Sequence, residues 1–198
     1  MGCEHAQAAG GQTAPQEFEE NTLSEVKRVI AVLSGKGGVG KSFVTGAIAT
    51  ELARHGHKVG VLDADITGPS IPKMFGMSGR HVHALGNLML PEISEHGVKV
   101  MSSPFTPRSR SRNLGCNVAC ETSWGPIDYL LVDMPPGTGD VALTVFQSLP
   151  VDGIVVVTSP QDLVSMIVAK AVNMAEKMNV PILGIVENMS YIECPDCG

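Results

Sequence analysis

The feature that most constrains this chain is a glycine-rich segment between a short apolar run and a helical pattern. Residues 29–33 (VIAVL) are continuously apolar and rich in β-branched side chains, which is typical of a strand buried on both faces of a parallel sheet. Residues 35–42 (GKGGVGKS) follow and match the spacing G-x-x-x-x-G-K-[ST] in full. A helical pattern then runs from residue 41 to about residue 55. The order of strand, glycine-rich turn and helix predicts a phosphate-binding loop rather than an ordinary turn.

Each residue type in this loop has a physical role in holding a triphosphate. Glycine lets the backbone curl so that successive N–H groups point at phosphate oxygens, and the N-terminus of the helix adds partial positive charge. We expect the Lys41 ammonium to reach the β- and γ-phosphates and the Ser42 hydroxyl to ligate Mg²⁺. The candidate nucleotide-binding residues of the loop are Gly35, Lys36, Gly37, Gly38, Val39, Gly40, Lys41 and Ser42.

Apolar runs and helical patterns alternate along the rest of the chain. Further strands are expected at residues 59–62, 98–101, 127–132, 153–158 and 182–186, and a second long helix at about 161–178. Strands that alternate with helices imply crossover connections, so we predict an α/β fold in three layers, a mostly parallel β-sheet with helices on both faces. We place one domain at residues 23–198, after a tail at residues 1–22 that we expect to be disordered.

Aspartates follow two of these predicted strands. Asp63 and Asp65 come after residues 59–62, and Asp133 comes after four apolar residues, 129–132. Open parallel sheets bind ligands at the carboxyl ends of their strands. An aspartate after a strand can also be a helix cap or a turn residue, but the complete loop upstream favours a metal site. We therefore predict that Asp63 and Asp133, with Ser42, hold Mg²⁺.

The five cysteines do not form the pattern of a disulfide-stapled protein. Cys194 and Cys197 make a C-x-x-C pair after the last predicted strand, and two thiolates cannot complete a four-coordinate site alone. The other ligands could come from Cys116 and Cys120, from Cys3 with another residue, or from the same pair in a second subunit. Spacing alone leaves an iron–sulfur cluster, a zinc site and a redox pair equally open.

Composition narrows the class of protein. The chain carries 20 Asp and Glu against 14 Lys and Arg, a formal net charge of −6, and only 4% of its residues are aromatic, which argues against nucleic-acid binding. No apolar run reaches the roughly 18–20 residues that span a bilayer, and the first residues lack the pattern of a secretory signal. We therefore predict a cytoplasmic protein that binds neither nucleic acid nor membrane.

Several longer motifs resemble the Mrp (ApbC) family of ATP-dependent iron–sulfur cluster carriers. They are GKGGVGKS (35–42), VLDADITGPSIPKMFG (61–76), LLVDMPPGTGD (130–140), VTSPQDLVSMIVAKAVNMAEKMNVPILGIVENMS (157–190) and YIECPDCG (191–198). This family belongs to a branch of P-loop ATPases, the deviant Walker A proteins, that includes MinD and ParA. MinD-like and ParA-like relatives share the loop but lack the terminal C-x-x-C.

The resemblance implies a P-loop NTPase fold, a slow Mg²⁺-dependent ATPase activity and the transfer of clusters to apo-proteins. It implies that Lys36 reaches across a dimer interface to the partner's nucleotide, that Asp65 orients the attacking water, and that Asn188 contacts the nucleotide base. Lys36, Lys41 and Asp65 are then the candidate catalytic residues. In the family, cysteines at the positions of Cys194 and Cys197 bridge a [4Fe–4S] cluster between two subunits, with Zn²⁺ as a substitute in aerobic preparations.

Two features depart from the family pattern. The segment 104–125 is short and rich in Pro, Arg and Ser, whereas members of the family carry a longer segment with a helix at this place. The chain ends one residue after Cys197, where members continue with a loop, a strand and a helix, so we expect a C-terminal truncation. Two alternative functions are a MinD/ParA-like positioning ATPase, which needs an amphipathic helix or a basic face, and a zinc-stabilised nucleotide-binding protein.

Overall fold

The structure of the chain is a computed structural model. It describes residues 24–65, 68, 70–80, 83–85, 88–102, 122–137, 145–146, 149–160 and 164–191. The predicted tail at residues 1–22 and residues 104–121 of the atypical loop lie outside these ranges. The elements are β1 (Ser24–Ser34), α1 (Lys41–Arg54), β2 (Val59–Asp63), α2 (Ile71–Met74), β3 (His83–Leu85), β4 (Leu88–Leu90), β5 (Glu92–Ile93), β6 (Lys99–Ser102), β7 (Gly125–Asp133), β8 (Gly153–Thr158), α5 (Val164–Met178) and β9 (Ile182–Glu187).

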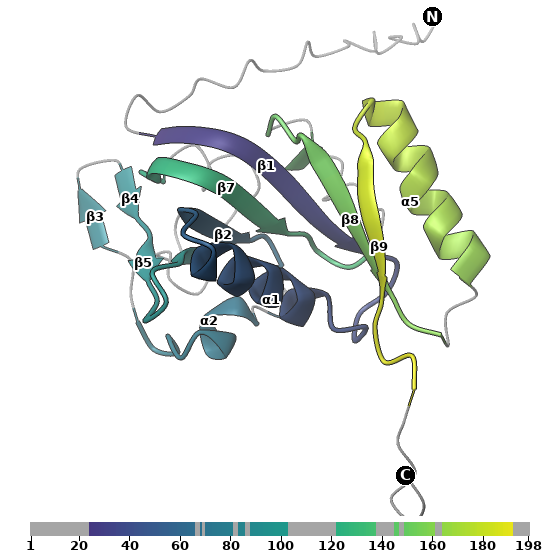
Figure 1. Ribbon diagram of the computed structural model, residues 1–198, viewed down its shortest axis with the longest axis horizontal. Coiled ribbons are helices and arrows are strands. Elements are labelled where there is room, and N and C mark those ends of the chain that lie inside the picture. Colours follow the sequence, from purple (N-terminus) through teal and green to yellow (C-terminus); the bar gives the residue numbers. More distant parts are fainter. Residues whose placement is uncertain are drawn as a thin grey trace, which may run out of the picture.

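A seven-stranded sheet forms the centre of the molecule, with the strand order β5-β6-β2-β7-β1-β8-β9 (Figure 1). Every neighbouring pair in it is parallel except β5 and β6, which are antiparallel. Strands β3 and β4 pair separately as a small antiparallel sheet. Parallel neighbours require crossover connections, and in the described part of the chain α1 lies between β1 and β2 and α5 between β8 and β9. The predicted mostly parallel sheet is confirmed.

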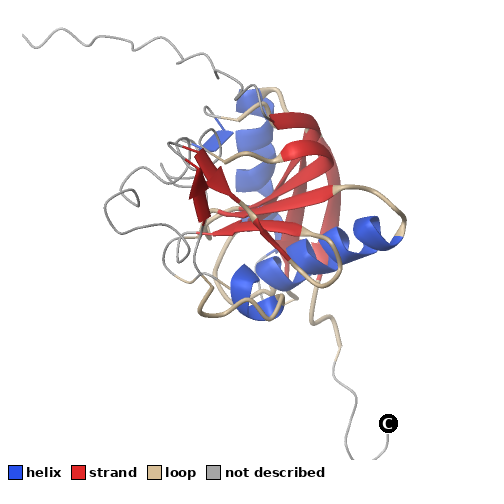
Figure 2. Cartoon of the chain, turned by 90° about the vertical axis from the view of Figure 1, so that its left-hand side faces the viewer, coloured by secondary structure: helices blue, strands red, loops and turns tan. Residues whose placement is uncertain are grey.

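Alternate side chains of the strands enter two different cores, because successive residues of a strand point to opposite faces. On one face Ala31 and Leu33 of β1 belong to a core that includes Met174 of α5. On the other face Val61 of β2 packs in a core with Ala49 of α1. Helices therefore cover both faces of the sheet, as the side view also shows (Figure 2). The prediction of three layers, helix, sheet and helix, is confirmed.

The central strands are buried where they approach the carboxyl edge of the sheet. All five residues of β2 are buried, and so are the last four residues of β1 and of β7. This apolar packing fixes the positions at which the strands end, and polar side chains follow directly at those ends. In the described part of the chain, none of the helices is long and apolar enough to cross a membrane.

Candidate nucleotide-binding site

The glycine-rich loop runs from the end of β1 to the start of α1, as the sequence predicts. Gly38 and Gly40 both have φ of 82°, in the left-handed region that glycine enters without steric cost. The Ser34 hydroxyl donates to the Lys36 carbonyl at 3.0 Å, and the Gly137 N–H donates to the Ser34 carbonyl at 2.9 Å. These bonds hold the loop in a curled conformation at the carboxyl edge of the sheet.

A hollow of about 410 Å³ lies over this loop. Its lining residues are Ser34, Lys36, Gly37, Gly38, Gly40, Lys41, Ser42, Phe43, Asp65, Gly68, Ser70, Met74 and Pro136. Six of the predicted loop residues and the predicted Asp65 therefore line one cavity, whose walls come from three separate strand ends. An amino group, a hydroxyl and a carboxyl beside curled backbone are a chemically suitable set for a phosphate ligand.

Three side chains at the start of α1 form hydrogen bonds with the Asp133 carboxylate. Lys41 Nζ lies 2.6 Å from Asp133 Oδ1, and the Ser42 hydroxyl donates to Asp133 Oδ2 at 2.6 Å. The Thr45 hydroxyl also donates to Asp133 Oδ1, at 3.0 Å. The side chains of Lys41 and Asp133 are buried, so this carboxylate is paired with a charge and satisfied by hydroxyls, as a buried ion requires. Thr45 was not predicted, although a residue four positions after Lys41 lies on the same face of the helix.

Asp63 ends β2 beside Asp133, because the two residues are in register between β2 and β7. Burial and the neighbouring Asp133 raise the pKa of Asp63 to about 7 from its ordinary 3.8. Opposing this shift, the Ser102 hydroxyl donates to Asp63 Oδ2 at 3.0 Å, and the Asp65 N–H donates to Asp63 Oδ1 at 3.1 Å. Adjacent carboxylates that repel one another, with a hydroxyl nearby, are oxygen donors that suit Mg²⁺. Ser102 was not predicted, because its role depends on the pairing of β6 with β2.

Asp65 and Asn188 approach the loop region from different strands. The half-buried Asp65 lies just past β2 and accepts a hydrogen bond from the Gly68 N–H at 3.3 Å. Asn188 follows β9, and its Nδ2 donates to the Val39 carbonyl at 2.9 Å. The structure thus brings Asn188 against the loop backbone itself, next to Gly40.

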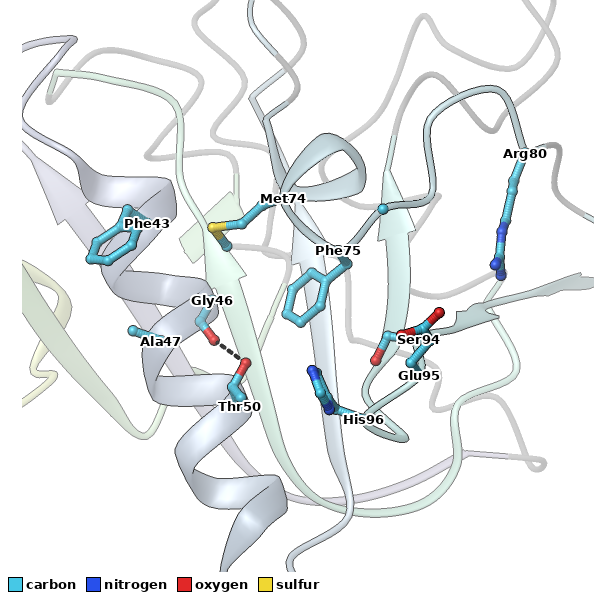
Figure 3. A pocket seen from close by; sticks show the side chains of 11 residues that line it. Phe43, Gly46, Ala47, Thr50, Met74, Phe75, Arg80, Ser94, Glu95 and His96 are labelled. Atoms are coloured by element: carbon cyan, nitrogen blue, oxygen red, sulfur yellow. Dashed lines mark hydrogen bonds between the residues drawn. The ribbon is translucent and has the colours of Figure 1, made fainter.

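A second hollow, of about 520 Å³, adjoins the first along α1 and shares Phe43 and Met74 with it (Figure 3). Its lining residues are Phe43, Gly46, Ala47, Thr50, Met74, Phe75, Gly76, Arg80, Ser94, Glu95 and His96. At Gly46 a Cβ would lie 1.7 Å from Met74 Cε, so the glycine allows α2 to pack closely on α1. The segment that follows Asp65 is therefore attached to α1 through Met74.

Cys194 and Cys197, together with Cys3, Cys116 and Cys120, all lie outside the described residues. Within the residues that are described, no three His, Cys, Asp or Glu side chains come together as a metal-binding group. The predicted thiolate site therefore stays a prediction.

Known proteins resemble the chain over most of its length. A family model described as ParA: NUBPL iron-transfer P-loop NTPase matches residues 25–198. An iron–sulfur cluster carrier protein of Clostridium perfringens is 46% identical over 215 aligned residues, which cover 99% of this chain and 75% of that protein. The chain spans only 50% to 66% of the length of seven further relatives with the same name.

Solved structures agree with this assignment. A nucleotide-binding protein of Archaeoglobus fulgidus in complex with ADP is 46% identical and superimposes with a TM-score of 0.78, covering 87% of this chain and 71% of that one. The cell division ATPase MinD of Pyrococcus furiosus superimposes with a TM-score of 0.64 at 22% identity, covering 81% and 71%, and supports the fold alone. With its loop, its aspartates and this match over residues 25–198, the chain belongs to the NUBPL iron-transfer family of P-loop NTPases.

Proposed function

We propose that this protein is an ATP-dependent carrier that holds an iron–sulfur cluster and transfers it to apo-proteins, with the cytoplasm as its predicted location. The observation that supports this most is the hydrogen-bonded group of Lys41, Ser42 and Asp133 beside a cavity, in a chain at least 42% identical to proteins named iron–sulfur cluster carriers. The nucleotide is the part of the function that the described residues support directly, and the cluster is its cargo.

ATP would bind with its phosphates in the cavity over the loop. Lys41, which lines this cavity, would then contact the β- and γ-phosphate oxygens. Asn188 would contact the base, since its Nδ2 donates to the Val39 carbonyl and its side-chain oxygen can accept a hydrogen bond from an amino group of the base. The relative from Archaeoglobus fulgidus, which was solved with ADP, supports an adenine nucleotide.

Mg²⁺, held by Ser42, Asp63 and Asp133, would supply positive charge that neutralises the phosphate oxygens during transfer. In this proposal Asp65 orients the water that attacks the γ-phosphate, and Lys36 of one subunit contacts the nucleotide of the other. Hydrolysis is then slow in the isolated chain, because the lysine that completes the site comes from a second copy. This assigns the catalytic roles to Lys36, Lys41 and Asp65.

The cargo would be held by Cys194 and Cys197. One pair supplies two thiolates and two copies supply four, which is the number that a [4Fe–4S] cluster needs. A cluster shared between two copies is exposed at their boundary, and a carrier needs such exposure to release its cargo. Zn²⁺ can occupy the same thiolates when the protein is prepared in air.

One substitution distinguishes the proposed cysteine site from the proposed nucleotide site. Cys194→Ala should abolish the binding of iron and sulfide in anaerobic reconstitution, measured by iron content and visible absorption, while ATP affinity stays unchanged. Cys120→Ala is the matched control and should retain iron. Equal loss of iron and of ATP binding in Cys194→Ala would contradict separable sites, and full retention of iron would contradict the assignment of the cysteine.

A further inference from the structure

The Thr45 hydroxyl contacts the Asp133 carboxylate from the interior of the protein. Thr45 lies four positions after Lys41 in α1 and is 0% exposed. Its hydroxyl oxygen lies 3.0 Å from Asp133 Oδ1 and 3.0 Å from the carbonyl oxygen of Lys41. Because a hydroxyl carries a single hydrogen, the two acceptors compete for it, and the charged carboxylate is the stronger acceptor.

The side chains that donate to Asp133 differ in where they lie. Lys41 and Ser42 line the hollow over the loop, whereas Thr45 is not among the described residues that line it. Lys41 is the predicted contact of the phosphates, and Ser42 is a predicted ligand of Mg²⁺. Among the described donors to this carboxylate, Thr45 is therefore the one that has no predicted ligand of its own.

A bond to one oxygen of Asp133 also determines where the other oxygen points, because both belong to one planar carboxylate. Thr45 donates to Oδ1, and Oδ2 is the oxygen on the side of Ser42, with which Asp133 is predicted to hold Mg²⁺. Carboxylates that ligate metals are themselves hydrogen-bonded by outer partners, which orient them. The Thr45 hydroxyl occupies the place of such a partner.

We propose that Thr45 is a positioning residue for the Mg²⁺ site, whose hydroxyl orients the Asp133 carboxylate without contacting the ion or the nucleotide. This inference rests on the proposed function, because it assumes that Asp133 holds Mg²⁺. It requires that the gain in nucleotide affinity produced by Mg²⁺ depends on the Thr45 hydroxyl. The affinity measured without the metal does not depend on it, because Thr45 acts through Asp133 alone.

Thr50 provides a matched control on the same helix. Its hydroxyl donates to the Gly46 carbonyl, four positions earlier, at 2.8 Å (Figure 3). The Thr45 hydroxyl is within reach of the Lys41 carbonyl at the same spacing. Within the described residues, no carboxylate takes part in the hydrogen bond of Thr50. Thr50→Val and Thr45→Val therefore remove equivalent hydroxyls from α1, but only Thr45→Val removes a donor from a carboxylate.

The experiment measures the affinity for ADP by calorimetry, first in EDTA and then at increasing concentrations of Mg²⁺. In the wild type, Mg²⁺ should raise the affinity. Thr45→Val should need about 10- to 100-fold more Mg²⁺ for half of that gain, the usual effect of losing an outer partner, while the affinity in EDTA stays within about twofold of wild type. Thr45→Ser, which keeps the hydroxyl, and Thr50→Val should both behave as wild type.

The outcomes distinguish this inference from the proposed function. A wild-type chain that binds no ADP, or whose ADP affinity does not respond to Mg²⁺, contradicts the proposed function. If the wild type responds, an unchanged Mg²⁺ requirement in Thr45→Val overturns the positioning role, and so does an equal effect in Thr45→Ser or in Thr50→Val. Should Thr45→Val not fold, Thr45→Ala, which places no methyl group against the carboxylate, must show the higher Mg²⁺ requirement, and an unchanged requirement there overturns the inference.

Discussion

The Lys41 ammonium lies 2.6 Å from Asp133 Oδ1, and the two side chains are only 7% and 0% exposed. The lysine predicted to bind phosphate is therefore paired with the aspartate predicted to hold Mg²⁺. Removing one member of a buried ion pair leaves the other charge without compensation, which costs far more free energy than the pair itself contributes. Substitution of either residue should therefore lower the free energy of unfolding as well as change the predicted binding site.

Lys41→Met should lower the free energy of unfolding by about 3–5 kcal/mol, because Asp133 is left as a buried, unpaired charge. Adding Asp133→Asn should restore part of this loss, because the remaining charge is removed. Urea denaturation of both variants measures the effect.

The matched control is Lys27→Met. It breaks the ion pair with Asp128, whose length of 2.7 Å is similar but whose side chains are 65% and 24% exposed. Solvent screens an exposed pair, so the change should be much smaller. Equal losses in the two lysine variants, or strictly additive effects of Lys41→Met and Asp133→Asn, would refute the account of a buried pair.

Asp63 should make stability depend on pH. Burial, and secondarily Asp133, raises the pKa of Asp63 to about 7, so between about pH 4 and pH 7 the folded chain holds a proton that the unfolded chain has lost. Stability from this group is therefore largest at low pH, falls as pH rises through that window and is constant above it. Comparison of the wild type with Asp63→Asn, by urea denaturation at about pH 5 and about pH 8, isolates the effect. The wild type should lose stability relative to the variant at the higher pH, and parallel changes in the two proteins would contradict the raised pKa.

Gly60 lies on β2, three positions before Asp63, and its lack of a side chain makes room for Trp124. A Cβ there would lie 2.9 Å from the indole atoms Cε3 and Cζ3 and 3.0 Å from Ile127 Cδ1. Because the buried indole cannot move aside, Gly60→Ala should destabilise the protein by about 1–3 kcal/mol and alter its tryptophan fluorescence. Trp124 is the only tryptophan of the chain, so the signal is unambiguous.

Gly184→Ala provides the comparison for this variant. Gly184 is also in a strand, β9, but nothing lies within 4 Å of its Cβ position. This substitution should be close to neutral. Similar losses at the two glycines would show that strand propensity, rather than the indole contact, governs the effect.

The two lysines of the loop should differ in what they do. Lys41→Ala should weaken ATP binding by about 10- to 100-fold, which corresponds to the free energy of a hydrogen bond to a charged group. Lys36→Ala should leave the ATP affinity of a single chain nearly unchanged and reduce hydrolysis by about 10³-fold, as loss of a cation supplied by a second subunit does. Calorimetry measures the affinities and phosphate release measures the rates. A parallel loss of binding in both variants would place Lys36 in the same subunit's site.

The parts of this fold that sequence alone predicted are those with local signals. The buried run of β1, the glycine-rich loop and the start of α1 lie next to one another in the chain, so composition and spacing were sufficient. The first residues of β1 were missed because side chains such as Lys27 are exposed, and only pairing with β7 makes them a strand. The short helix α2 and the small strands β3 to β5 contain too few residues to show a period.

Contacts between distant segments could not be predicted. The sequence placed Asp63 and Asp133 at the same edge of the sheet, but their side-by-side register depends on how β2 pairs with β7. The contact between Asn188 and Val39 joins residues 149 positions apart and needs β9 to lie at the edge next to β8. Proximity of this kind is a property of the assembled sheet.

The central claim is that two copies of this chain hold one cluster through their Cys194 and Cys197 thiolates. Native mass spectrometry of the anaerobically reconstituted protein tests it most directly, because it reports subunit number and inorganic content together. We predict a dimer that carries a single [4Fe–4S] cluster and that falls apart to metal-free monomers in Cys197→Ala. A monomer that carries its own metal, or a protein that takes up only zinc, would contradict the account.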